Sequence, residues 1–298
     1  MEMRQLGKTD MRVSVLGFGG VQIGSNSSLT DVEQLLGSAL DAGLNVIDTA
    51  ECYDDSEEMI GKAVAERRND YYLFTKCGHA VGEELPNLPD WDPRLLGASI
   101  DRSLRRLRTD HLDLIQLHSC SLDVLRKGDV IKVLQKAQGA GKTRYIGYSG
   151  DNEDARYAIR TGFFDTIQTS INIADQQEID FTLPMARERG MGIIAKRPIA
   201  EAAWLHTTLN KSDYAYPYWE RLQRLQYDFL IDPNSVGIAL RFTLSVPGVD
   251  VAIVGTANPA RWQQNADQLA QGPLPQELFD AIRARWEERA DQHWLGQV

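Results

Sequence analysis

The sequence predicts an α/β fold, the (β/α)8 TIM barrel with an N-terminal β-hairpin, on three observations. After the hairpin, eight short apolar runs alternate with helical patterns along the 298-residue chain, as they do in a parallel barrel. Polar side chains follow several of these runs, where the carboxyl ends of parallel strands meet. No shift in composition marks a boundary, so we expect a single domain over residues 1–298.

The first half of the chain begins with the hairpin and continues as strand and helix in turn. Two alternating runs flank the turn at Gly7–Asp10, and Val13–Phe18 predicts the first barrel strand. Thr30 is the expected N-cap of a helix that stops at Gly43. The other elements expected here are strands at Val46–Asp48, Tyr72–Lys76 and Leu112–Leu117, and helices near Ser56–Ala65 and from Asp92 to Leu107.

The second half repeats this alternation. A doubly wound open sheet is the competing fold, but Gly17, Gly19 and Gly20 do not form a GxGxxG motif followed by an acid about 20 residues later. The strands expected here are Tyr145–Ser149, Thr166–Ser170, Gly192–Lys196 and Val251–Val254, and the helices lie near Val130–Ala140, Asn152–Arg160, Leu183–Arg189 and after Asp232–Pro233.

Composition restricts the class of protein. The formal net charge of -10 argues against a nucleic-acid or anionic-membrane partner, because these need a positive surface. No apolar run approaches the roughly 20 residues that span a bilayer, and the N-terminus lacks a signal-peptide core, so we expect a cytoplasmic protein. The three cysteines lack zinc-site spacing, and we expect no metal.

Four polar residues indicate the chemistry. Asp48 and Tyr53 follow the second strand, Lys76 ends the third and His118 follows the fourth, so the barrel brings them to one mouth. Each alone is typical of a strand-end cap or of packing, but their joint occurrence suits proton donation to a carbonyl oxygen as hydride arrives. We expect Lys76 to lower the pKa of Tyr53, and Asp48 to keep the lysine charged.

The same residues carry a family resemblance. GLNVIDTAECYDDSEEMIGKAV (Gly43–Val64), LFTK (Leu73–Lys76) and DLIQLH (Asp113–His118) resemble the aldo-keto reductase family in order and spacing. The resemblance implies a (β/α)8 barrel that reduces a small-molecule aldehyde or ketone with NADP(H), in preference to NAD(H). It makes Tyr53 the catalytic proton donor, Lys76 and Asp48 the residues that tune it, and His118 the residue that orients the carbonyl.

The cofactor residues implied by the resemblance depart from the family pattern in places. Ser149 and Gln168 match the residues that hold the nicotinamide carboxamide, while Gly150 replaces a usual asparagine and Asn152 follows two residues later. Lys196 replaces the usual stacking aromatic, in a Lys196–Arg197–Pro198 run that either covers the ring or carries solvated charges. The adenosine end is expected on Gly255, Thr256, Arg261, Gln264 and Asn265, with Arg261 on the 2′-phosphate.

Three functional alternatives stay open at this stage. The first and favoured alternative is a carbonyl reductase. The second is a nucleotide-binding sensor or regulatory subunit with little turnover, which Gly150 and Lys196 support. The third is a barrel enzyme that binds a sugar phosphate. The aromatic segment Ala200–Trp219 is either a lid over the cofactor or packing on the barrel.

Overall fold

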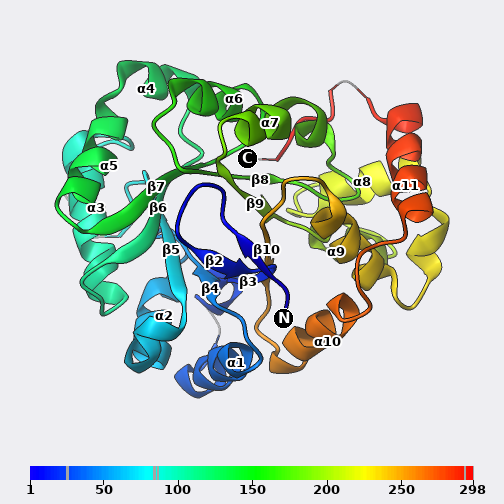
Figure 1. Ribbon diagram of the computed structural model, residues 1–298, viewed down its shortest axis with the longest axis horizontal. Helices are drawn as coiled ribbons and strands as arrows, with labels where there is room; N and C mark the ends of the chain where they lie inside the picture. The colour runs from blue at the N-terminus through cyan, green and yellow to red at the C-terminus, as the bar shows by residue number, and fades with distance from the viewer. Residues whose placement is uncertain (25–26, 83–84, 86, 292, 298) are drawn as a thin grey trace.

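The computed structural model describes residues 1–24, 27–82, 85, 87–291 and 293–297, and contains a closed barrel of eight parallel strands (Figure 1). The strands follow one another around the barrel in chain order, and the last pairs with the first to close the ring. The predicted (β/α)8 barrel is therefore confirmed, as is the hairpin that precedes it. The barrel strands are β3 (Leu16–Gly19), β4 (Val46–Asp48), β5 (Tyr72–Cys77), β6 (Leu112–His118), β7 (Thr143–Ser149), β8 (Thr166–Ser170), β9 (Gly192–Lys196) and β10 (Val251–Gly255).

Helices surround the barrel and cover the outer face of its strands (Figure 1). They are α1 (Leu29–Asp41), α2 (Ser56–Val64), α3 (Pro93–Arg106), α4 (Leu122–Lys127), α5 (Asp129–Gly139), α6 (Asn152–Thr161), α7 (Gln177–Glu188), α8 (Tyr216–Leu225), α9 (Ser235–Ser245), α10 (Pro259–Leu269) and α11 (Gln276–Arg289). The described residues also form the 3-10 helices η1 (Gly20–Ile23), η2 (Ala65–Asp70), η3 (Ala200–Leu205) and η4 (Asp228–Ile231).

Two expected boundaries were wrong at the start of the chain. The run Val13–Phe18 forms two strands, because β2 (Arg12–Ser14) pairs with β1 (Met3–Gln5) in the hairpin while β3 pairs within the barrel. Helix α1 begins before Thr30, and its N-cap is Ser28, whose hydroxyl accepts a hydrogen bond from the amide of Asp31.

Other helices were missed or were predicted too short. Helix α7 begins at Gln177, well before the expected start at Leu183, and carries Pro184 in its interior. The helices α4, α8 and α11 were not predicted. In contrast, the expected start of α3 is confirmed, because the Asp92 side chain accepts from the amide of Arg94 and Pro93 lies in the first turn.

The hairpin covers the end of the barrel where the strands begin. Its buried side chains Leu6, Met11 and Val13 pack on barrel-interior residues that include Val46 and Phe74. These residues form a separate, smaller cluster inside the barrel, while the main apolar core lies between the strands and the helices. Since this end is filled, the chemistry has to be sought at the opposite end.

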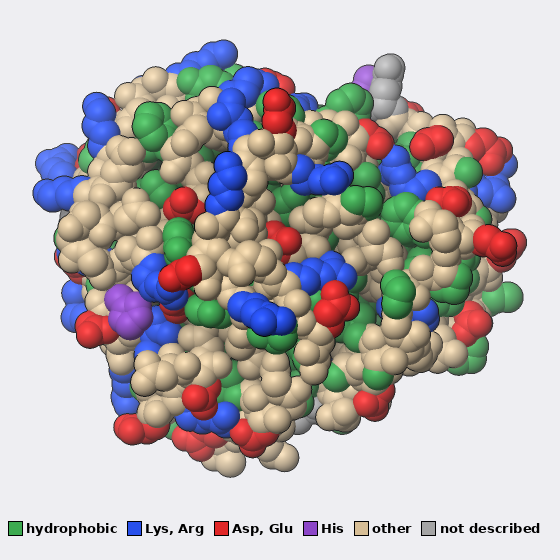
Figure 2. All heavy atoms as spheres, viewed as in Figure 1, with side chains coloured by type: hydrophobic (Ala, Val, Ile, Leu, Met, Phe, Trp, Pro, Cys, Tyr) green, Lys and Arg blue, Asp and Glu red, His purple; other side chains and the backbone are tan. Residues whose placement is uncertain are grey.

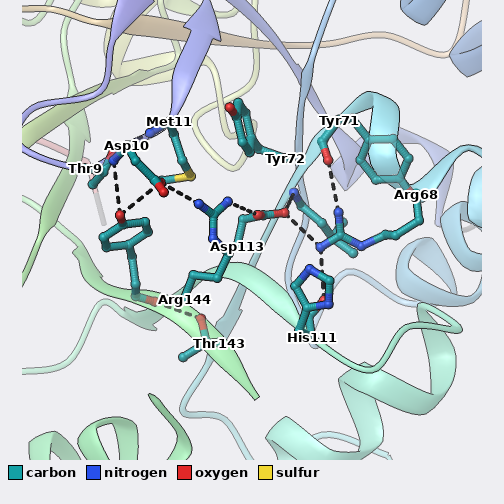
Figure 3. Close-up of polar contacts among 12 residues, drawn as sticks. Thr9, Asp10, Met11, Arg68, Tyr71, Tyr72, His111, Asp113, Thr143 and Arg144 are labelled. Atoms are coloured by element: carbon teal, nitrogen blue, oxygen red, sulfur yellow. Dashed lines mark hydrogen bonds and ion pairs between the residues drawn. The ribbon is translucent and has the colours of Figure 1, made fainter. Parts of the chain in front are cut away.

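A charged network fastens the hairpin turn to the barrel (Figure 3). Arg144 on β7 donates to Asp10 in the hairpin turn and, at 2.8 Å, to the buried Asp113 on β6. Asp113 also accepts from Arg68 at 2.8 Å. The arrangement gives a buried carboxylate two charge-assisted partners, as burial of a charge requires.

The outer surface mixes charges of both signs. On the face shown in Figure 2, basic side chains lie among acidic ones. Within the described part of the chain, none of the helices has the length and apolar character needed to cross a membrane.

Candidate active site

The four predicted catalytic residues lie together at the carboxyl end of the barrel. Asp48 ends β4, Lys76 lies at the end of β5 and His118 ends β6, while Tyr53 lies in the loop before α2. All four line one cavity of about 940 Å³. The structure thus places in one site side chains that are spread over the first 118 residues of the chain.

Lys76 and Asp48 form a buried ion pair. The Lys76 Nζ lies 2.6 Å from Asp48 Oδ2 and donates to the carbonyl of Thr49 at 2.9 Å. Burial acts to lower the pKa of Lys76, but Asp48 and Tyr53 more than offset it and the pKa is raised. The ammonium is therefore held charged, in the way that the sequence predicts for Asp48.

Tyr53 lies against this ammonium. The Lys76 Nζ is 5.2 Å from the centroid of the Tyr53 ring. Burial nevertheless raises the pKa of Tyr53, and the opposing effect of Lys76 is smaller. The expectation of a lowered phenol pKa was therefore wrong, because it counted the charge and left out the desolvation. Tyr53 holds its proton at neutral pH.

His118 completes the polar group and has a partner of its own. Its ring centroid lies 5.7 Å from that of Tyr53, in an edge-on arrangement at 79°. Burial and the charge of Lys76 hold the pKa of His118 well below its usual range, so the imidazole is neutral. The Sγ of Cys52 lies 3.4 Å from His118 Nδ1, which leaves Nε2 for other contacts. Burial also raises the pKa of Cys52 to about 11, which keeps the thiol protonated.

Gln116 is a site residue that the sequence reasoning missed. Its Nε2 lies 3.4 Å from Asp48 Oδ1 and 3.4 Å from Gln168 Oε1, so it links two parts of the barrel mouth. The available signal was alternation, because Gln116 lies two residues before His118 on the same strand and faces the same side.

The two residues expected to hold a carboxamide, Ser149 and Gln168, lie on the neighbouring strands β7 and β8. Ser149 pairs in register with Gln168, and both line the cavity. The buried Ser149 hydroxyl has no hydrogen-bond partner among the residues that the structure describes. A buried polar atom without a partner indicates a place for a polar ligand atom.

The glycine that replaces the family's asparagine has a local cause. A Cβ at Gly150 would lie 2.7 Å from the Tyr148 ring, so a larger residue does not fit this backbone. Asn152 does not take over the role, because it donates to the carbonyl of Gly296 at 3.2 Å and accepts from its amide at 3.0 Å. Asn152 instead holds the C-terminal segment.

Lys196 and Arg197 share a buried carboxylate that the sequence reasoning missed. Lys196 Nζ lies 2.8 Å from Asp151 Oδ2, and Arg197 Nη1 lies 3.9 Å from the same oxygen. Asp151 is fully buried, and Lys196 and Arg197 are only 14% and 13% exposed, so the alternative of solvated rim charges was wrong. A buried acid directly after Gly150 was the available sequence signal.

The C-terminal segment lies over this cluster. Arg197 Nη1 donates to the carbonyl of Gln297 at 2.6 Å and to the Ser170 hydroxyl at 2.7 Å. The same guanidinium nitrogen thus joins Gln297 to Ser170, the last residue of β8. Together with the Asn152 contacts, these bonds hold residues 296–297 beside Arg197 and Asn152.

The segment expected to hold the adenosine end follows β10. Gly255, Thr256, Arg261 and Asn265 all line the cavity, as does Pro198, which follows the neighbouring strand β9. Helix α10 begins here, and Asn258 accepts from the amides of both Ala260 and Arg261. The helix therefore offers a phosphate the positive end of its dipole and the Arg261 side chain. Gln264 is exposed on α10 and is not among the residues that line the cavity.

The aromatic segment divides between its two expected roles. Tyr214 lines the cavity, and the Arg197 guanidinium lies 5.2 Å from its ring centroid. Tyr218 is buried in the main core, and the Trp204 indole donates to Ser235 at 3.0 Å. Glu201, Ala202 and Tyr214 of the segment therefore line the site, while Trp204 and Tyr218 pack on the barrel. Over the described ranges, no group of three or more His, Cys, Asp and Glu side chains is placed to hold a metal ion.

Comparison with known proteins identifies relatives that match nearly the whole chain. L-galactose dehydrogenase of Arabidopsis thaliana is 27% identical over 99% of this chain and 97% of its own. A Schizosaccharomyces pombe protein described as a putative voltage-gated potassium channel subunit beta is 32% identical over 88% of this chain and 86% of its own. The holo form of an aldo-keto reductase from Bacillus halodurans superposes with a TM-score of 0.85 at 25% identity, over 99% of both chains. A sequence model of the aldo/keto reductase family matches residues 15–287. The protein is therefore a member of the aldo/keto reductase family and an oxidoreductase that acts on carbonyl or CH-OH groups.

Proposed function

We propose that this protein is an NADPH-dependent carbonyl reductase in which Tyr53 supplies the proton. The observation that carries the proposal is the placement of the Tyr53 phenol beside Lys76 and His118, in a cavity large enough for a dinucleotide and a small substrate. Family membership supports the reaction class. The particular aldehyde or ketone is left open by the proposal.

The residues around the cavity fit a nicotinamide dinucleotide. The Ser149 hydroxyl lacks a protein partner among the described residues, and Gln168 lies opposite it, so the two suit a carboxamide. At the other end, Arg261 and the first turn of α10 suit phosphate groups. The presence of an arginine fork favours the 2′-phosphate of NADPH over the free hydroxyl of NADH.

In this proposal the chain's own residues position and protonate the substrate. The bound reduced nicotinamide supplies the hydride. The tautomer that this role requires has its proton on Nε2, where it can be donated to the substrate oxygen, and His118 Nδ1 then accepts from the protonated Cys52 thiol 3.4 Å away. Tyr53 donates its proton to the same oxygen, and the Lys76 ammonium stabilises the resulting phenolate. Asp48 keeps Lys76 charged and oriented.

The test is the variant Tyr53→Phe, which removes the proton and leaves the ring. We expect NADPH oxidation with a panel of small aldehydes to fall by about 10²–10⁴-fold, while the Kd for NADPH changes little. Tyr145→Phe is the matched control, because that tyrosine lies at the other end of the barrel and bonds Asp10. Undiminished turnover in the Tyr53 variant would contradict the proposal.

A sensor or regulatory subunit is the second candidate. The replacement of the stacking aromatic by Lys196 favours it, as does similarity to a protein described as a channel subunit. A sensor would bind NADPH with a normal affinity, and the wild-type protein would show negligible turnover with every aldehyde in the panel.

A further inference from the structure

Lys196 is the last residue of β9 and lies at the carboxyl end of the barrel. In register it pairs with Ser170 of β8 and Ile253 of β10, on the same barrel rim as Ser149 and Gln168. Its side chain lines the cavity and is 14% exposed. The amino group is therefore held in one place, unlike the mobile lysines of a protein surface. Burial lowers its pKa, and the Asp151 carboxylate opposes that shift and favours the ammonium.

The cluster around Lys196 carries a net positive charge. Lys196 and Arg197 share the single carboxylate of Asp151, at 2.8 and 3.9 Å. The nearby buried Asp175 does not balance the second cation, because burial raises its pKa to about 8 and it is largely protonated at neutral pH. Within the group of Lys196, Arg197 and Asp151, two cations against one anion leave one excess positive charge beside the cavity. Glu201 also lines the cavity near Arg197, and burial raises the pKa of its carboxyl group.

This charge lies where the nicotinamide ring has to bind, if the proposed function holds. The ring must reach Tyr53 with its reactive carbon and Ser149 and Gln168 with its carboxamide, which places it along the rim that Lys196 closes. The two redox states of that ring differ by one charge, because the reduced ring is neutral and the oxidised ring is a cation. An aromatic side chain at this position stacks on either form, but an ammonium repels the cation.

We propose that Lys196, oriented by Asp151, makes the site select the redox state of its cofactor, so that NADP⁺ binds less tightly and is released more readily than NADPH. Lys196 acts here as a specificity-determining residue and takes no part in the proton transfer. The selection favours the reductive direction, because the oxidised product of each turnover is the form that the site holds more weakly.

The expected size of the effect follows from Coulomb's law in a partly buried site. The charge acts at contact distance, in a site of intermediate effective dielectric, and Asp151 neutralises part of it. Under these conditions it changes the relative affinity for the two forms by about 10-fold.

The test measures dissociation constants for NADPH and NADP⁺ by quenching of protein fluorescence. For Lys196→Met we expect the ratio of the NADP⁺ constant to the NADPH constant to fall about 10-fold, mainly through tighter NADP⁺ binding. Lys196→Arg keeps the charge and should keep the ratio. Arg261→Met is the matched control: it should weaken both forms together and leave the ratio unchanged, because both carry the same phosphates.

A folding defect has to be separated from the effect, since Lys196→Met leaves Asp151 buried without its nearest partner. Lys196→Gln removes the positive charge but keeps a hydrogen-bond donor for Asp151, and it should lower the ratio in the same direction. A ratio unchanged in both folded variants would overturn the inference. If wild-type protein reduces aldehydes through Tyr53 and the ratio does not respond, only this inference fails; if wild type binds neither nucleotide, the proposed function fails as well.

Discussion

The Lys76 ammonium lies 2.6 Å from the Asp48 carboxylate, with both side chains almost fully buried at the end of the barrel. Asp48→Asn keeps the shape but leaves the ammonium without its counter-charge, and breaking a buried pair in this way typically costs about 3–5 kcal/mol. We expect a loss of that order in the free energy of unfolding, measured by urea denaturation. Asp48→Asn/Lys76→Met removes both charges and should lose less; an equal or larger loss in the double variant would contradict the pairing.

Arg261 allows a test of cofactor choice. If its guanidinium contacts the 2′-phosphate, Arg261→Met removes a charge-assisted interaction that NADH never makes. We expect the Kd for NADPH to rise at least about 10-fold and the Kd for NADH to change less than about two-fold, measured by fluorescence titration. If the Kd values for NADPH and NADH rise by the same factor, Arg261 contacts a part of the cofactor that the two nucleotides share.

The thiols of the cysteines near the site should react slowly with alkylating reagents, despite their position. Burial raises the pKa of Cys52 to about 11 and that of Cys120 to about 12, and raises the pKa of Cys77 well above its usual value. Since the thiolate is the reactive form, we expect slow alkylation by iodoacetamide at pH 7.5 and rapid alkylation of all three in urea. Mass spectrometry of timed samples gives the rates. Rapid labelling of folded Cys52 would show that its thiol is not held in this state.

Glu51 gives stability a pH dependence. It is buried, accepts from the His79 amide at 2.9 Å and from the Ser99 hydroxyl at 3.0 Å, and burial raises its pKa from 4.5 to about 8. Between those values the folded protein binds more protons than the unfolded chain, so this group's contribution falls as pH rises, by at most about 1.4 kcal/mol per pH unit. Glu51→Gln should make the free energy of unfolding fall less steeply between pH 5 and 8. A profile that keeps the wild-type slope would assign the dependence to another group.

The barrel and the position of the four polar residues could be predicted because both follow from local patterns. Apolar runs ending in Asp48, Lys76 and His118 mark strand ends, and closure of a parallel barrel then gathers them at one mouth. The strands β8 and β9 were predicted with the observed boundaries for the same reason. Periodicity failed at α11, whose apolar residues do not follow a strong helical stripe.

The features of the site that the sequence did not predict depend on contacts between residues far apart in the chain. The pKa of Tyr53 follows from how deeply the fold buries it, which outweighs the nearby ammonium. Asp151 meets Lys196 across two strands of the barrel, and Gly296 meets Asn152 over 144 residues of chain. These partners could be named only after the barrel had closed and the C-terminal segment had been placed.

The contacts of that segment determine where a purification tag or fluorescent label can be attached. Gln297 accepts from Arg197 beside the site, whereas the N-terminal strand β1 belongs to the hairpin that covers the other end. An extension joined after Val298 would strain the hydrogen bond between Gln297 and Arg197 and disturb cofactor titrations. We therefore expect N-terminally tagged protein to give the native affinities and C-terminally tagged protein to depart from them.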